Sequence, residues 1–536
     1  MNGPISFKFK TSISLLAAAA LFIAPVLRFS WDIGPQTVLH LLCLAMLLSA
    51  AGRNTFNLRS PLFLACLAFL GSVSLPLLFK ANSSAVYQNL LVLSDCLIVA
   101  LTAAVSGEED RKTLLIIPVL LALTFSFMIV IASLLWRLGL YVNYPLIAEA
   151  IVNYNVLAGY LLLALPLSFI YWSDDSPTGY ISSLVIMLAM ALTGSRAATA
   201  IGAGALLLFQ TVYFKGKRPK SYSAITALAL ITAAAAAFLG KNALSDSIAE
   251  RLNWWQTALN IFFANPVIGI GWGNFADYAP AFRPAPGAAS IYTHNIALQL
   301  LAETGLLGLT TFILIVIAFI NDGVRKRLHT MYGQTVPLII SVSSFLLLNL
   351  FDYGFHIPAL MLLFFFILGS LADLPHKPKE TGDALRLGLG AVFLSAGFLA
   401  SLPFLANLFY EKGLHYFETN NYTKAAYYLE KSSRLDKSNW RVYSKLAELY
   451  YTRYSAENTG NLIDAAVEAQ RRAVSIFPES SRLYSDLAWL LMDKKDGSGA
   501  LKAMRKAVLY DKFNANYKQS LAIIEKKAKN DYIKRS

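Results

Sequence analysis

Long uninterrupted blocks of apolar residues are the feature that most limits what this chain can fold into. Each block runs for roughly 18 to 25 residues, which is the length of helix that crosses the hydrocarbon layer of a bilayer. The blocks recur through most of the 536 residues, and only 15% of the residues are charged. A soluble protein of this length carries about a quarter charged residues. The sequence therefore predicts an all-α polytopic membrane protein.

About 12 to 13 segments satisfy the twenty-residue criterion for a transmembrane helix. Their approximate limits are 12–27, 34–51, 61–79, 84–105, 112–136, 154–172, 180–194, 197–214, 222–240, 294–320, 335–351, 357–373 and 385–406. We expect residues 1–409 to form the transmembrane domain, with one large loop at 241–293.

The distribution of basic residues predicts the orientation of this domain. With the N-terminus in the cytoplasm, clusters such as 215–220 (KGKRPK) and 325–327 (RKR) lie inside. The outer loops hold isolated basic residues, and the excess of lysine and arginine inside is about two to one, as the positive-inside rule requires. The turn at 193–196 (TGSR) must then be tight. The loop 241–293 is expected on the outer face.

Charge and cysteine content exclude several other classes of protein. The formal net charge is +14, but in a membrane protein basic residues gather in cytoplasmic loops and near lipid headgroups, so no nucleic-acid partner is expected. Cys43, Cys66 and Cys96 lie in or beside apolar blocks without CxxC spacing. We expect them to be buried, unreactive thiols.

The composition changes after Phe409, where long apolar runs stop and a repeat begins. Small and apolar residues recur with spacings of 3, 9, 4 and 3 in two sets, namely Gly413, Tyr416, Ala425, Leu429 and Ser432, then Ala488, Leu491, Ala500, Met504 and Ala507. The pattern resembles the tetratricopeptide repeat (TPR), whose period is about 34 residues. We expect residues 410–536 to form a TPR domain of about three repeats, with a capping helix near 517–530. An odd number of spans places it outside the cytoplasm, where it would dock a protein partner.

The glycine-rich stretch 269–275 (GIGWGNF) has the composition of a nucleotide-binding loop. A dinucleotide fingerprint requires a preceding strand in a βαβ unit, whereas residues 251–263 (RLNWWQTALNIFF) have the pattern of a helix. ATP and NAD are therefore excluded. Two interpretations remain: the glycines allow tight backbone turns between Pro266 and Phe275, or they contact a ligand directly.

Several polar side chains fall at the outer ends of the predicted spans, where such groups are costly unless they have a function. They are Asn155, Arg196, Arg251, His294, Asp352 and His356. Arginine suits a phosphate ligand, and histidine suits removal of a proton from a hydroxyl. No cysteine or histidine cluster has zinc spacing and no paired carboxylates suggest a metal, so neither metal nor cofactor is expected. The pattern indicates transfer of a group from a lipid diphosphate to an acceptor hydroxyl.

An ordered set of motifs resembles the O-antigen ligase and polymerase superfamily of bacterial membrane glycosyltransferases. The set spans about 200 residues and comprises 153–158 (NYNVLA), 193–198 (TGSRAA), 251–259 (RLNWWQTAL), 265–275 (NPVIGIGWGNF), 293–305 (THNIALQLLAETG) and 350–356 (LFDYGFH). Members with an appended TPR region form a familiar subgroup. The resemblance implies a GT-C-like fold in the bacterial inner membrane and a metal-independent, inverting transfer from an undecaprenyl-diphosphate-linked glycan. In ligases the acceptor is a sugar of the lipid A core.

The resemblance also implies roles for individual residues. Arg196 and Arg251 would bind the donor diphosphate, and His294 would act as the general base or orient the acceptor. Many relatives have a histidine where this chain has Asn349, which leaves the roles of Asp352 and His356 open.

Each of these residues also has a structural alternative. Arg196 would cap a turn or reach headgroups, Arg251 would pair with Glu250 or Asp246, His294 would cap the next helix, and Asn155 would make a polar contact at a helix start. Glu303 is expected to form an internal hydrogen bond near Thr304 and Gly305. Trp254, Trp255 and Trp272 are expected at the membrane interface, or stacked on sugar rings.

The motifs do not separate three outcomes of the same chemistry: ligation to lipid A core, polymerisation of the glycan, and glycosylation of protein serine. A transporter of lipid-linked sugars is a fourth alternative from another class. It would require ionisable residues near the bilayer midplane and broken helices, whereas the predicted charges lie at one face.

Overall fold

The computed structural model describes residues 12–52, 60–79, 84–139, 153–171, 178–213, 244–327, 332–372, 383–457 and 459–535, with a few positions between 223 and 231. Every regular element in these residues is a helix, which confirms the all-α prediction. The predicted span at 222–240 and the basic segment at 215–220 lie largely or wholly outside the described residues.

One group of helices forms an apolar bundle. Its members are α1 (Ser12–Val26), α2 (Ile33–Gly52), α3 (Pro61–Ser74), α4 (Ser84–Val105), α5 (Glu108–Arg137), α7 (Tyr154–Ser168), α8 (Thr178–Leu192), α9 (Arg196–Tyr213), α13 (Ile296–Arg327), α14 (Tyr332–Leu348) and α15 (Pro358–Leu371), with α16 (Asp383–Glu418) at its side. Short 3-10 turns follow α1 (η1, Arg28–Ser30), α3 (η2, Leu75–Leu78) and α7 (η3, Phe169–Tyr171), and η5 (Gly354–His356) precedes α15.

Five helical segments in the described residues are long and apolar enough to cross a membrane. They are Pro61–Leu78, Ser84–Val105, Glu108–Leu135, Tyr154–Tyr171 and Ile296–Gly323, and six shorter apolar helices of the bundle accompany them. The bundle is the transmembrane part of a membrane protein. Its three cysteines are free and buried, as expected.

Helix α15 lies at the centre of the bundle. All of its residues from Pro358 to Leu371 are buried, so the helix is apolar on every side because it meets protein on every side. A Cβ on Gly159, near the start of α7, would lie 2.9 Å from Leu360, near the start of α15. The two helices therefore begin at the same end of the bundle.

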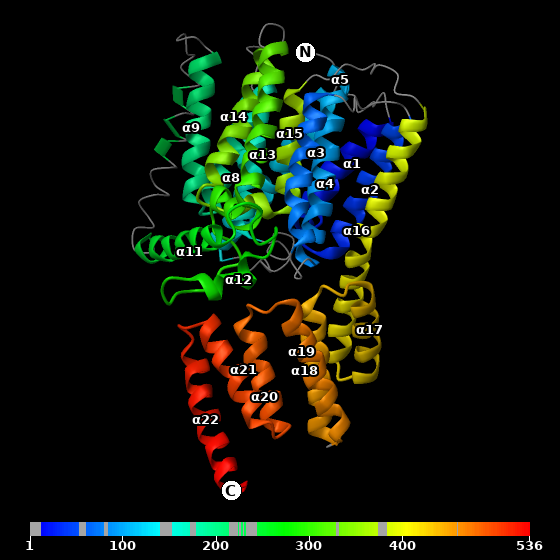
Figure 1. The fold of residues 1–536 in the computed structure, drawn as a ribbon. Coiled ribbons are helices and arrows are strands. Elements are labelled where there is room, and N and C mark those ends of the chain that lie inside the picture. Colours follow the sequence, from blue (N-terminus) through cyan, green and yellow to red (C-terminus); the bar gives the residue numbers. More distant parts are fainter. Residues whose placement is uncertain are drawn as a thin grey trace.

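Two further helices lie across that part of the molecule. Figure 1 shows α11 (Leu244–Ala264) running roughly across the direction of the bundle, with α12 (Phe275–Phe282) beside it. Helix α11 packs on α13 and α12. The helix expected just before the glycines is thus confirmed.

The C-terminal helical region (residues 410–535) consists of antiparallel helices that pack in chain order. After the end of α16 come α17 (Tyr422–Leu435), α18 (Trp440–Glu457), α19 (Gly460–Ile476), α20 (Ser481–Asp493), α21 (Gly497–Tyr510) and α22 (Ala515–Arg535). The recurrent residues of the sequence pattern are at the helix crossings, since Ala425, Ala488, Ala500 and Ala507 are all fully buried.

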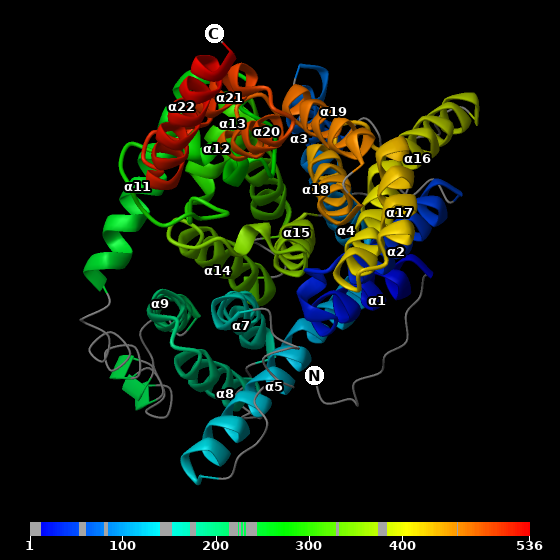
Figure 2. The ribbon, with the colours of Figure 1, turned by 90° about the horizontal axis from the view of Figure 1, so that it is seen from below.

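Helix α16 joins the bundle to the C-terminal helical region without a break. The sequence boundary at 409 and 410 falls inside this helix of 36 residues. Figure 2, which looks along the bundle, shows the C-terminal helices arching over α2, α3, α4 and α12 and leaving α7, α8 and α9 uncovered in that view. The bundle, the crosswise helices and the C-terminal region therefore meet at one end.

Candidate active site

The glycine-rich loop (residues 265–274) connects α11 to α12 and is held against α13 by backbone hydrogen bonds. The N–H of Ile270 donates to the carbonyl of Ala302 at 3.1 Å, and the N–H of Gly271 donates to that of Glu303 at 2.8 Å. Gly269 has a φ of 67°, and a Cβ on it would lie 2.3 Å from the carbonyl carbon of Glu303. Only glycine permits this approach.

Gly305 allows the same close backbone approach from the side of α13. Its φ of 66° interrupts the helix, and a Cβ there would lie 2.3 Å from the carbonyl oxygen of Val267. The N–H groups of Leu306 and Leu307, freed by this kink, donate to the carbonyls of Pro266 at 2.9 Å and Val267 at 3.2 Å. The interpretation of the glycines as residues that permit tight backbone turns is confirmed.

The buried carboxylate of Glu303 fixes the start of α12. Its Oε1 accepts a hydrogen bond of 2.9 Å from the N–H of Phe275, the first residue of that helix. Such N–H groups have no partner within their own helix. Glu303 therefore forms an internal hydrogen bond, but its partner lies on another segment rather than near Thr304 and Gly305. Glu303 thus supports the site through the loop.

His294 is placed two residues before α13 in a strained backbone conformation. Its φ is 55°, which is uncommon for a residue other than glycine and is frequent at functional sites. Trp255 holds the preceding residue by donating from Nε1 to the carbonyl of Thr293 at 3.0 Å. Asn295 caps α13 by accepting from the N–H of Leu298 at 3.1 Å. The cap is therefore not formed by the His294 side chain.

Four rings form a cluster at this position, which we call the ring cluster: Tyr292, His294, Tyr353 and His356. The imidazole of His294 meets Tyr353 edge-on at 5.1 Å, and Tyr353 stacks on Tyr292 at 5.3 Å, between ring centres. Tyr292 in turn contacts His356 at 4.7 Å. On its other side, His294 stacks on Trp254 at 5.0 Å. The cluster joins the starts of α13 and α15.

Electrostatics keep the imidazole of His294 neutral. Burial lowers its pKa to about 4, and the positive charge of Arg251 on α11 acts in the same direction. At neutral pH the ring therefore carries a free lone pair that can accept a proton. Its proximity to Arg251 also places a fixed cation beside a hydrogen-bond acceptor.

Asp352 and His356 flank the same cluster. Burial raises the pKa of Asp352, while the N–H of Tyr353 and the charge of Arg251 oppose the rise. Burial lowers the pKa of His356 to about 4. The carbonyl of Tyr353 is near this imidazole and opposes the shift, but neither ring nitrogen has a partner at hydrogen-bonding geometry among the described residues.

The two predicted arginines are not engaged by the side chains that the structure describes. Neither Arg196 nor Arg251 forms an ion pair or a hydrogen bond through its guanidinium with a residue that the structure describes, Glu250 included. Arg196 is the first residue of α9, directly after the tight turn at 193–195. Helix α8 begins where α7 ends, since Ser168 and Ser183 are hydrogen-bonded at 2.6 Å. Arg196 therefore lies at the same end of the bundle as the start of α7.

The structure brings some of the predicted site residues together and leaves others apart. Arg251, His294, Asp352 and His356 interact with one another or through Tyr353. Asn155 is exposed in the first turn of α7, where its backbone N–H donates to Oδ1 of the capping residue Asn153 at 2.8 Å.

Asn349 has a structural role that the sequence did not reveal. Its Nδ2 donates to the carbonyl of Phe345 at 2.8 Å and its Oδ1 accepts from the N–H of Phe355 at 2.7 Å. Its carbonyl accepts from the N–H of Ile296 at 2.8 Å. Asn349 therefore ties η5 to the start of α13 and sets the position of the ring cluster.

Sequence reasoning missed the tyrosines of the ring cluster. The available signal was their position, because Tyr292 precedes His294 by two residues and Tyr353 follows Asp352 directly. The expectation for Trp272 was wrong: its side chain is 2% exposed and packs against Phe69 rather than lying at an interface. Trp254 and Trp255 are partly exposed, and each donates a hydrogen bond to the loop before His294.

The site combines the permanently charged guanidinium of Arg251 with the neutral imidazole of His294. Among the residues that the structure describes, no group of three or more histidine, cysteine, aspartate or glutamate side chains is placed to hold a metal ion. Arg251 offers a planar donor for phosphate oxygens, and His294 offers a proton acceptor.

Comparison with known proteins identifies the family of this segment. Residues 181–313 match the family model for O-antigen ligase. The match includes Arg196, Arg251 and His294 and ends before Asp352. No curated protein sequence matches the chain. This segment includes helices of the apolar bundle, and the match supports the resemblance of the chain to the O-antigen ligase and polymerase superfamily.

Proposed function

We propose that the protein transfers a glycan from an undecaprenyl-diphosphate carrier to a hydroxyl of a lipid A core sugar, on the periplasmic face of a bacterial inner membrane. The family supports a transfer of the ligase or polymerase type. The observation that carries the proposal is the guanidinium of Arg251, which forms no ion pair with the described side chains and whose charge acts on the neutral imidazole of His294.

The proposed reaction is a single inverting displacement. The acceptor oxygen attacks the anomeric carbon and forms the new glycosidic bond while the bond from that carbon to the phosphate oxygen breaks. Undecaprenyl diphosphate leaves with the bonding electron pair, and the acceptor proton passes to a ring nitrogen of His294. Arg196 and Arg251 stabilise the negative charge that develops on the leaving diphosphate, so the step uses no metal ion.

Arg251 also controls the strength of the base in this proposal. Its charge lowers the pKa of His294 in the free protein. A bound diphosphate compensates that charge, so the pKa of His294 rises when the donor is present. The base would thus become stronger only after the leaving group is in place. Asp352 and His356 would adjust this local field, and Asn155 would be a peripheral contact.

The C-terminal helical region is proposed to be a periplasmic TPR domain that holds a protein partner. Its paired helices with small buried residues support the TPR assignment. It lies at the same end of the molecule as α12, which follows the glycine-rich loop. If His294 faces the periplasm, the C-terminal region therefore does so as well.

The test is a transfer assay in reconstituted membranes with an undecaprenyl-diphosphate glycan as donor. Lipid A core, a second donor molecule and a periplasmic protein are offered as competing acceptors. Arg434→Gln is a matched control, because it removes one arginine from an exposed position on α17.

Product on lipid A core that is lost in His294→Ala and Arg251→Ala, but not in the control, is the expected result. Product on the glycan or the protein would retain the mechanism and replace the acceptor. Undiminished transfer by both variants would disprove the assigned site. Absence of transfer to every acceptor would favour a transporter instead.

A further inference from the structure

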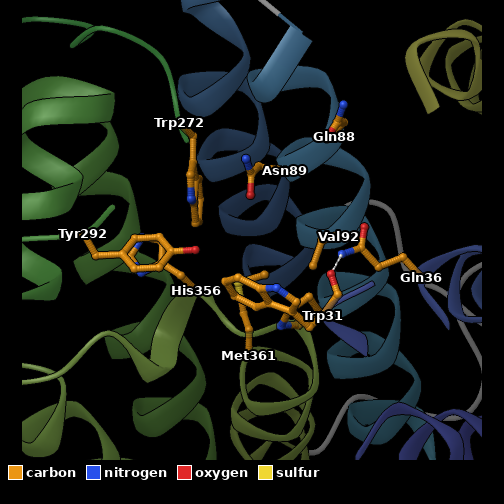
Figure 3. Close-up of a pocket in the computed structure, with 10 residues that line it drawn as sticks. Trp31, Gln36, Gln88, Asn89, Val92, Trp272, Tyr292, His356 and Met361 are labelled. Carbon is orange, nitrogen blue, oxygen red and sulfur yellow. Dashed lines mark hydrogen bonds between the residues drawn. The ribbon is translucent and has the colours of Figure 1, made fainter. Parts of the chain in front are cut away.

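A polar cavity lies next to the ring cluster, on the far side of Tyr292 from His294. It has a volume of about 150 Å³. A cavity of about this volume holds one benzene molecule, so the space accommodates a single six-membered ring. Its walls come from α2, α4, the glycine-rich loop and the segments around α13 and α15. Figure 3 shows Tyr292, Trp272, Asn89 and Trp31 arranged around it.

The lining combines aromatic rings with uncharged polar groups. Trp31, Trp272 and Tyr292 supply rings, and Asn89 and Gln36 supply amides. No lysine, arginine, aspartate or glutamate is among the described residues that line the cavity. A diphosphate would find no counter-charge here, so the lining favours a neutral ligand with an apolar face and many hydroxyls.

Several polar atoms of the wall lack protein partners. The Tyr292 hydroxyl and the indole N–H groups of Trp31 and Trp272 form no hydrogen bond with a residue that the structure describes. Asn89 uses only its Nδ2, which donates to the carbonyl of Ala85 at 2.8 Å. These groups provide both donors and acceptors, and a ring of hydroxyls pairs with such a set.

The glycines of the loop help to build this cavity. A Cβ on Gly273 would lie 2.3 Å from Nδ2 of Asn89, and a Cβ on Gly271 would lie 2.7 Å from the side chain of Val86. The loop therefore packs closely on α4 and inserts Trp272 between α4 and His356, whose ring is 6.3 Å from the indole.

We infer that this cavity binds one neutral sugar residue of a glycan substrate, next to the sugar that reacts at His294. The inference rests on the proposed function and extends it to a specificity subsite. The cavity is separated from His294 by the stacked pair of Tyr292 and Tyr353, with ring centres 5.3 Å apart. Tyr292 and His356 line the cavity, so a sugar residue there would direct its neighbour in the chain toward the ring cluster that contains His294. The glycan could belong to the acceptor or to the donor, and the experiment separates the two.

The test measures binding by saturation-transfer NMR to the full-length protein in detergent. The two probes are the lipid-free core oligosaccharide and the glycan released from the donor without its diphosphate. Tyr292→Phe removes one hydroxyl and keeps the ring, and Trp31→Ala removes one aromatic wall. Trp31→Phe restores an aromatic face, and Tyr422→Phe removes a tyrosine hydroxyl from the surface of α17 as a control.

We expect one of the probes to bind saturably, and its identity assigns the cavity to the acceptor or to the donor glycan. Tyr292→Phe should weaken that binding about threefold to tenfold, the effect of one uncharged hydrogen bond. Trp31→Ala should weaken it more than Trp31→Phe, which keeps an aromatic face and loses only the indole N–H, while Tyr422→Phe should bind like the parent. Inorganic diphosphate should not displace the probe.

Three results would overturn the inference: no binding of either probe by the parent, equal binding by Tyr292→Phe and Trp31→Ala, or displacement by diphosphate. Transfer activity is read separately. If the parent transfers glycan and both variants do so with unchanged kinetics, the subsite is refuted and the proposed function is kept. A parent that binds sugar as expected but transfers none would refute the function and keep the subsite.

Discussion

Arg441 of α18 holds Asp277 of α12 through both carboxylate oxygens, at 2.9 and 3.0 Å from its Nη2. This contact joins the C-terminal helical region to the helix that directly follows the glycine-rich loop. Around it, the ring of Tyr278 lies 5.0 Å from that of Phe477, in an apolar cluster that includes residues of both regions. A second ion pair, between Arg283 and Asp511 at 2.6 Å, closes the same interface.

Breaking the Arg441 and Asp277 pair should loosen the attachment of the C-terminal region. Asp277 is only 11% exposed, so Arg441→Gln removes the charged partner of a largely buried carboxylate, which keeps the hydrogen bond from Nε1 of Trp440 at 3.4 Å. We expect a loss of about 1–2 kcal/mol and a lower Tm in detergent. Asp277→Asn combined with Arg441→Gln should recover part of the loss. Arg434→Gln serves as the control, and an equal Tm for all three variants would contradict the role of the pair.

The pH dependence of transfer should reveal the neutral state of His294. Because the base must be unprotonated, kcat/KM should fall with an apparent pKa near 4, the value set by burial and Arg251. The bound diphosphate raises the pKa of His294, so the acid limb of kcat should lie at a higher pH. A His294→Gln variant should lose roughly 10²–10⁴-fold in kcat and show no such limb. If the acid limb of the pH profile persists in this variant, the group that titrates is not His294.

Removal of the Arg251 charge should change the titration of His294 directly. With Arg251→Gln the pKa of His294 should move upward from about 4, because one of the two causes that lower it is gone. NMR of labelled histidine in the detergent-solubilised protein measures this shift without requiring activity. Arg283→Gln, which removes an arginine at the end of α12, is the comparison. An identical shift of the His294 pKa in this variant would exclude a specific effect of Arg251.

The same histidines make stability depend on pH. Both His294 and His356 have folded-state pKa values near 4, below the ordinary value of 6.5. At pH values between 4 and 6.5 the unfolded chain binds more protons than the folded chain. The free energy of unfolding therefore decreases as the pH falls from 6.5 toward 4. Above pH 6.5 these histidines no longer change it. Thermal unfolding at pH 7 and pH 5 checks the sign. Replacing His356 with glutamine should reduce the difference between the two pH values.

Substitution of Gly269 or Gly305 should destabilise the glycine-rich loop without changing any side chain that we assign to the reaction. Gly269→Ala and Gly305→Ala each place a Cβ 2.3 Å from a backbone atom and require a positive φ. We expect each to cost more than about 2 kcal/mol and to increase cleavage of residues 265–274 by protease. Gly204→Ala in α9 is the control, since a Cβ there meets nothing within 4 Å.

Substitutions of Glu303 should separate hydrogen bonding from charge. Glu303→Gln retains an oxygen that can accept from the N–H of Phe275, whereas Glu303→Leu leaves this group without a partner. The glutamine variant should therefore keep most of the Tm and the transfer rate, and the leucine variant should lose both. A glutamine variant that folds like the parent but transfers nothing would instead assign a chemical role to the carboxylate.

The sequence was sufficient to predict features that depend on local pattern. Apolar length predicted the helical bundle, and small-residue spacing predicted the paired helices in which Ala425 and Ala500 are buried. The glycines and His294 were recognised because glycine at a turn and a polar residue at a helix start have local signatures. The turn at the glycines and the position of His294 before a helix could be stated before their partners were known.

Features that depend on distant contacts were not predictable in this way. Nothing near Glu303 in the sequence indicates Phe275 as its partner, and nothing near Trp272 indicates that it is buried beside Phe69. The change in composition after Phe409 suggested a boundary, yet α16 continues through it, because a helix can exchange an apolar environment for an aqueous one without interruption. The roles of Arg196 and Asn155 depend on a ligand and are not fixed by the fold alone.

The continuity of α16 has a mechanical consequence. A helix of 36 residues is about 54 Å long at 1.5 Å per residue, so it acts as a strut that sets how far the C-terminal helices stand from the bundle. The ion pairs with α12 and the interface around Phe477 brace the other end of the arch. Because the C-terminal helical region is attached at both ends, it cannot rotate as a domain on a flexible linker does. The C-terminal helices therefore keep a fixed distance and angle relative to the bundle.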